Sequence, residues 1–145
     1  MSRAHFIFLG ILTGSLLCAA HGFWAGLSWI APVPLLYALV HCDTRTAFYT
    51  GLACGFFESL ILFGLSHAGP MVFGTIALLY ALSRALFSLA FVSLRQGDYL
   101  RLLAPTLWVF FEWGQAQIPL TLPNILGDTF DGGDLFGVVR LGGTY

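Results

Sequence analysis

Charge is scarce in this sequence of 145 residues, and lysine is absent altogether. Only 9% of the residues are charged, whereas soluble domains have about 25%. All of the basic residues are arginines and the net charge is −1, so no basic patch is available for nucleic-acid phosphates. Hydrophobic residues make up 58% of the chain. This composition excludes nucleic acid as a partner and predicts that lipid surrounds most of the protein.

Residues that hold metals or carry out catalysis are also rare. There are three cysteines without C-x-x-C spacing: Cys18, Cys42 and Cys54. Nothing beside them supplies the base or cation that activates a thiolate, and no two histidines share metal-ligand spacing. The acidic loop over residues 128–134 lacks the Gly and Glu that complete a calcium loop. We therefore expect this chain to bind no metal and no cofactor and to contain no catalytic residue.

Long apolar runs occupy most of the chain and predict an all-α fold. The prediction is a single domain over residues 1–145, a polytopic transmembrane helix bundle of about five spans and the start of a sixth. The spans are residues 6–20, 22–40, 47–66, 70–94, 102–117 and, incompletely, 135–145. Pro32 and Pro34 are expected to break the second span. The last run covers only about 16 Å of a hydrocarbon core of about 30 Å, so we expect a truncated or split protein.

Arginine placement predicts the orientation of these spans. Alternate loops contain Arg3, then Arg45, then Arg95 and Arg101, and the opposite loops contain none. Because cytoplasmic loops carry an excess of Lys and Arg, the N-terminus is predicted to be cytoplasmic. The chain is then a multi-pass membrane protein, and the acidic loop lies on the outer side.

Two opposite charges, Glu58 and Arg84, fall inside predicted spans. Each lies about 10 or 11 residues from the inner end of its span, so the two reach similar depth on antiparallel neighbours. A charge at the helix centre costs about 2.5–3.5 kcal/mol and normally faces a partner or water. We predict that they form an intramembrane ion pair. It either locks two helices together or borders a polar substrate cavity.

Glu112 lies beside Trp113 and four residues after Trp108, which shares its helical face. This carboxylate is either an interfacial acid among belt tryptophans or part of a site for a lipid or peptide headgroup. With Pro123 in the loop that follows, these residues are our candidates for a lipid or substrate surface.

Several segments resemble one family in their order along the chain: residues 29–36 (WIAPVPLL), 47–57 (AFYTGLACGFF), 105–113 (PTLWVFFEW), Pro123, and 142–145 (GGTY). The chain looks like the N-terminal membrane domain of apolipoprotein N-acyltransferase, an enzyme of lipoprotein maturation, and the resemblance implies a bacterial inner membrane. The family pattern departs at Gln115, where an arginine is usual. The resemblance implies phospholipid as a partner and support for acyl transfer to a lipoprotein's N-terminal cysteine.

The family's chemistry depends on a nitrilase-like domain with a Glu-Lys-Cys triad, and this chain has no lysine from which to build one. We therefore expect the chain to be inactive alone and to need a separate nitrilase-like domain. The alternative is a small transport or channel-type membrane protein that uses Glu58 and Arg84 as a polar pathway.

Overall fold

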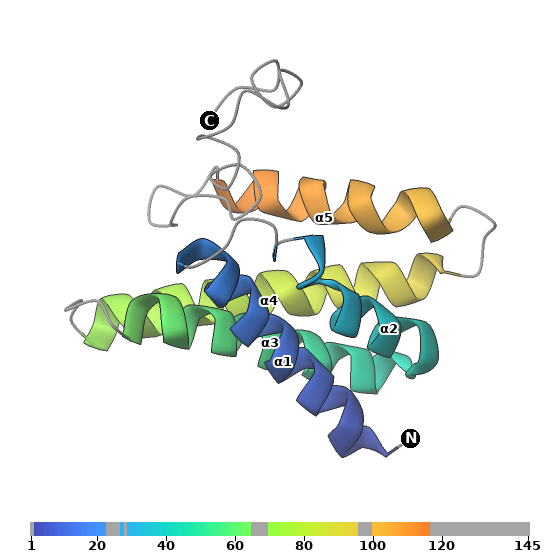
Figure 1. Ribbon diagram of the computed structural model, residues 1–145, viewed down its shortest axis with the longest axis horizontal. Coiled ribbons are helices and arrows are strands. Elements are labelled where there is room, and N and C mark those ends of the chain that lie inside the picture. Colours follow the sequence, from blue (N-terminus) through green and yellow to red (C-terminus); the bar gives the residue numbers. More distant parts are fainter. Residues whose placement is uncertain (1, 23–26, 28, 65–69, 96–99, 117–145) are drawn as a thin grey trace.

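The computed structural model describes residues 2–22, 27, 29–64, 70–95 and 100–116, which are almost entirely helical (Figure 1). The predicted sixth span at residues 135–145 and the candidate Pro123 lie outside these described residues. The described helices are α1 (Arg3–Gly22), α2 (Val33–His41), α3 (Thr44–Gly64), α4 (Pro70–Leu94) and α5 (Leu100–Ala116). The all-α prediction is confirmed for this part of the chain.

Two of the described helices contain a stretch that is long and apolar enough to cross a membrane, judged by length and composition. These stretches are Arg3–Ala20 in α1, with a mean hydropathy of 1.5, and Phe73–Leu94 in α4, with a mean hydropathy of 1.8. The finding supports association with a membrane. Two such helices do not confirm the predicted bundle of about five spans.

The second predicted span differs from the structure. The chain makes tight turns before Pro32, in which the N–H groups of Ile30 and Ala31 both donate to the carbonyl oxygen of Leu27. A regular helix begins only at Val33, so α2 has nine residues and covers about 14 Å. The two prolines explain the break, because each removes a backbone donor and fixes φ at a helix start. By itself α2 is too short to cross the hydrocarbon.

Helix α3 packs between α1 and α4, and glycines bring the three backbones close together (Figure 1). A Cβ added to Gly10 of α1 would lie 2.4 Å from the carbonyl oxygen of Thr50 on α3. A Cβ added to Gly55 of α3 would lie 2.3 Å from the carbonyl oxygen of Tyr80 on α4. Only glycine permits these approaches, so the G-x-x-x-G spacings Gly10/Gly14 and Gly51/Gly55 mark helix contacts.

One end of the bundle gathers the N-terminus, the α2–α3 connection and the C-terminal end of α4 (Figure 1, right). Arg95 donates a hydrogen bond through Nη1 to the carbonyl oxygen of Leu39, near the end of α2. Arg3 acts electrostatically on Asp43 at the start of α3. Arginines that are far apart in the sequence therefore lie at the same end of the protein.

Helix α5 lies along α4, which is the helix it packs against most closely (Figure 1). Aromatic side chains join them: the ring of Phe87 meets Trp108 edge-on at 5.2 Å and Phe111 at 6.0 Å between centroids. Edge-to-face contacts of this kind stabilise packing beyond the area they bury. They hold the Trp108 side of α5 against the middle of α4.

Candidate functional site

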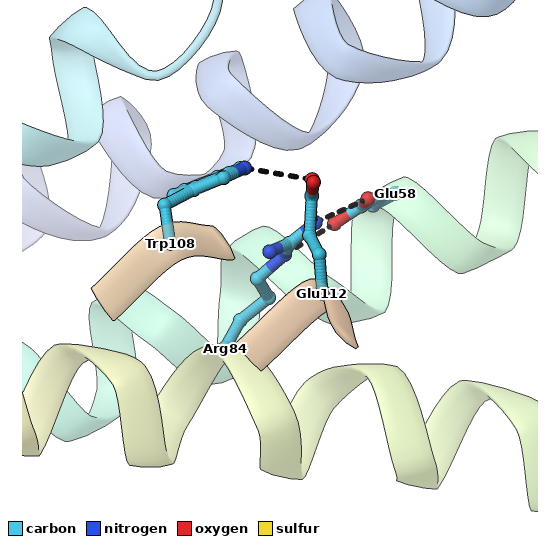
Figure 2. A network of polar contacts seen from close by, with 4 residues as sticks. All are labelled: Glu58, Arg84, Trp108 and Glu112. Atoms are coloured by element: carbon cyan, nitrogen blue, oxygen red, sulfur yellow. Dashed lines mark hydrogen bonds and ion pairs between the residues drawn. The ribbon is translucent and has the colours of Figure 1, made fainter. Parts of the chain in front are cut away.

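A buried ion pair joins α3 to α4 at the centre of the bundle. Arg84 donates from Nε to Oε2 of Glu58 and from Nη2 to Oε1 of Glu58, both at 2.9 Å (Figure 2). The side chains of Glu58 and Arg84 are 0% and 1% exposed. Two parallel bonds between a planar guanidinium and a carboxylate fix the geometry of both side chains. The structure thus brings together the two residues that the depth argument predicts to pair.

Helix α5 adds a second carboxylate and an indole to this pair. Glu112 Oε1 lies 3.9 Å from Arg84 Nη2, and Trp108 donates from Nε1 to the same Oε1 at 2.7 Å (Figure 2). The face of the Trp108 ring lies 4.2 Å from Arg84 Cζ, within cation–π range. Both residues are buried, since Trp108 is 4% and Glu112 is 6% exposed. We call Glu58, Arg84, Trp108 and Glu112 the charge cluster.

Local sequence explains how α5 presents its two members. Trp108 and Glu112 are four residues apart, so they lie on the same helical face, one turn apart. That face turns toward α4, whereas Trp113 lies on another face and is 45% exposed. Of the surface candidates, Trp108 and Glu112 therefore belong to the buried cluster and Trp113 does not. The structure does not describe the loop that contains Pro123.

Glu58/Arg84 and Trp108/Glu112 are predicted as two separate sites, and the structure joins them. Counted from the arginine-rich end, Glu58 lies 14 residues after Thr44, Arg84 lies 10 before Leu94, and Glu112 lies 12 after Leu100. At 1.5 Å per residue these depths are about 21, 15 and 18 Å, which places the three charges in one layer. The same depth count, applied to Glu112 within its predicted span at residues 102–117, could have joined the two sites from the sequence alone.

The groups that the charge cluster offers are one guanidinium, two carboxylates and one indole. The cluster has no nucleophile with an adjacent base, and the nearby Cys54 is fully buried. Among the described residues, no group of three or more His, Cys, Asp or Glu is placed to hold a metal ion. What the cluster does offer is a fixed guanidinium with one indole face against it and carboxylates on two sides. Such a group binds hydrogen-bond acceptors.

Family resemblance finds no independent support from comparison with known proteins. The chain matches no protein-family model, and neither a curated protein nor a solved structure matches it.

Proposed function

We propose that this chain is a polytopic helix bundle of about five spans in a bacterial inner membrane, with a cytoplasmic N-terminus. It is the membrane part of an apolipoprotein N-acyltransferase-like protein. In this role it binds phospholipid and supports acyl transfer to the N-terminal cysteine of a lipoprotein. A separate nitrilase-like domain supplies the catalytic groups.

The observation that carries the proposal is an inverted distribution of charge and apolar surface. The charge cluster is buried, while large apolar side chains are exposed on α1 to α5, among them Phe8, Val33, Phe56, Leu78, Leu82, Leu86, Val109 and Phe110. Soluble proteins place charges at the surface and rarely expose extended apolar faces. In lipid the same arrangement is favourable, because charges face the bundle interior and apolar side chains face the hydrocarbon.

Support for the orientation comes from the arginine-rich end of the bundle. Arg3 at the start of α1, Arg45 in the first turn of α3 and Arg95 after the end of α4 all belong to this end, which the positive-inside rule places in the cytoplasm. Reporter fusions at the α2–α3 connection and after Ala116 test it. Cytoplasmic activity at the first position and periplasmic activity at the second are expected, and the reverse result would reject the orientation.

Support for the acyl-transfer role comes from the segment that carries most of the resemblance. Residues 105–113 (PTLWVFFEW) lie on α5, and Trp108 and Glu112 are the two side chains of this segment that contact Arg84. The segment therefore couples the outer helix of the bundle to its charged centre. A substitution at Glu112 should therefore affect the binding of any substrate that docks along α5.

Reconstitution with a nitrilase-like partner tests the role directly. The chain alone in phospholipid vesicles should transfer no acyl group to a lipoprotein peptide with an N-terminal cysteine, and addition of the partner should start transfer. Glu112→Gln should reduce transfer, whereas Leu102→Met, at an exposed position of the same helix, should not. Failure of every partner, together with no retention of phospholipid, would exclude the role.

Transport is the alternative function, and the full burial of Glu58 and Arg84 inside apolar helices favours it, since such charges often mark ion or proton paths. Flux through vesicles that disappears in Glu58→Gln would establish transport. Vesicles that stay tight with the wild-type chain would dismiss it.

A further inference from the structure

Arg84 has more donor capacity than its ion pair uses. A guanidinium carries five N–H donors in a planar fork. Nε and Nη2 both face Glu58, so planarity directs Nη1 away from that carboxylate. Nη1 is buried and has no hydrogen-bond partner, and in the described part of the chain only Ser83 Oγ shares this condition. A serine hydroxyl can rotate toward its own helix, whereas the fork of Arg84 is fixed.

A buried N–H of a charged group without an acceptor is unfavourable, because its lost hydration is not replaced. As the four side chains are arranged, none of them supplies that acceptor, because Nη1 has no hydrogen-bond partner. Both oxygens of Glu58 are bonded to Nε and Nη2, and Glu112 Oε1 accepts from Trp108. The indole of Trp108 presents a ring face to the guanidinium, not an acceptor atom. The acceptor at Nη1 therefore comes from outside this set.

The charge of the cluster restricts the class of that acceptor. Glu58 already compensates Arg84 through two bonds, and Glu112 lies 3.9 Å from Nη2. A third anion would meet two carboxylates at short range in a medium of low polarity, which is repulsive. An uncharged oxygen meets no such repulsion, and it satisfies the donor equally well.

We propose that Arg84 Nη1 is a binding site for one uncharged oxygen acceptor, which either a water molecule or the ester carbonyl of a phospholipid acyl chain can supply. Arg84 then has two roles, as the partner of Glu58 and as a ligand-binding residue between α4 and α5. The inference does not depend on acyl transfer, since any setting that buries the cluster requires the same acceptor.

The test uses the full chain with isotope-labelled arginine in nanodiscs of phosphatidylethanolamine, with either ester-linked or ether-linked chains of equal length. Solid-state NMR measures polarisation transfer to the Arg84 guanidinium from water, from lipid chain protons next to the linkage, and from lipid phosphorus. Arg84→Lys assigns the signal, because it keeps a cation facing Glu58 and removes Nη1. Arg95→Lys is the matched control and should leave the Arg84 signal unchanged.

Transfer from the ester-linked lipid that is lost with the ether-linked lipid identifies the carbonyl as the acceptor. Equal transfer from water in both membranes identifies water. Each result supports the site. Absence of transfer from water and lipid in both membranes would overturn it, and so would transfer from phosphorus, which marks an anionic ligand. All three transfer measurements use the wild-type chain, so a poorly folded variant does not prevent the decision.

Discussion

Trp108 donates from its indole Nε1 to Oε1 of Glu112 at 2.7 Å, one helical turn along α5. This bond orients the carboxylate and the ring together, so that the oxygen approaches Arg84 Nη2 while the ring face covers Arg84 Cζ. A hydrogen bond within one helix thereby organises a contact between two helices. The docking of α5 on α4 depends on a polar pair as well as on aromatic packing.

Trp108→Phe is therefore expected to weaken this docking. Phenylalanine keeps an aromatic ring against Phe87, but it lacks the N–H donor and has a weaker cation–π attraction. Loss of a hydrogen bond to a charged group and part of the cation–π term corresponds to about 2 kcal/mol. Denaturation by SDS in mixed micelles, followed by circular dichroism, measures it.

The control is Trp113→Phe on the exposed face of α5, which should change the free energy of unfolding by less than about 0.5 kcal/mol. Equal losses from the two substitutions would show that the Trp108–Glu112 bond does not stabilise the docking of α5.

The helices and one ion pair could be predicted from the sequence, because long apolar runs fix helix positions and helix rise fixes depth. Glu58 and Arg84 illustrate this, since depth alone makes them neighbours. Rotation about a helix axis is different. The depth count could place Glu112 in the layer of Glu58 and Arg84, but it does not give the rotation of α5 about its axis, so the contact of Glu112 with Arg84 could not be derived.

The second predicted span shows another limit. Pro32 and Pro34 indicate a break, but proline chemistry alone does not decide whether a helix kinks and continues or starts again. In the structure the chain turns before Pro32, where the carbonyl oxygen of Leu27 accepts from both Ile30 and Ala31, and α2 starts anew after Pro32. Tertiary packing of Leu35, Ala38 and Leu39 into the core then holds this short helix in place.

Gly55→Ala should destabilise the bundle through the α3–α4 contact. The new Cβ would lie 2.3 Å from the carbonyl oxygen of Tyr80 and 2.8 Å from Cα of Ala81, so the backbones must separate. Overpacking of this kind costs about 1–3 kcal/mol. The same micelle denaturation measures the loss of unfolding free energy.

Gly74→Ala in α4 is the matched control, because no atom lies within 4 Å of a Cβ added there. It should leave stability unchanged or raise it by up to about 1 kcal/mol, since alanine is the better helix former. Destabilisation of similar size at Gly55 and Gly74 would contradict the close approach of α3 and α4.

Asp43 makes the start of α3 sensitive to acid. The hydroxyl of Thr46 donates to Asp43 Oδ1 at 2.5 Å, and the backbone N–H of Thr46 approaches Oδ2 at 3.4 Å. These hydrogen bonds, with the hydroxyl's the larger cause, lower the pKa of Asp43 below its usual value. A lowered carboxyl pKa contributes stability above the unfolded pKa and loses it as the pH falls through the folded pKa.

The wild-type chain should therefore lose stability below a pH of about 4, and Asp43→Asn should lose less over that interval because its cap does not titrate. Denaturation at several pH values compares the two slopes. Thr46→Val removes the hydroxyl donor, so the folded pKa of Asp43 rises toward its unfolded value and the acid loss should become smaller. Parallel slopes for all three proteins would show that Asp43 has no part in acid sensitivity.

Glu58 and Arg84 should show strong energetic coupling in a double-mutant cycle of Glu58→Leu, Arg84→Met and the combined variant. Removal of one partner from a buried pair costs about 3–5 kcal/mol, whereas replacement of both by apolar side chains leaves neither of them as an uncompensated charge. The loss of unfolding free energy in the double variant should therefore be smaller than the sum of the two single losses by at least about 2 kcal/mol.

The single variants should also differ, because Arg84 serves more partners than Glu58 does. In Glu58→Leu, the guanidinium keeps Glu112 within 3.9 Å and the face of Trp108. In Arg84→Met, both carboxylates lose the same cation, so this variant should be the less stable one. Additive losses within about 0.5 kcal/mol, or a less stable Glu58→Leu, would mean that the charge cluster does not act as a unit centred on Arg84.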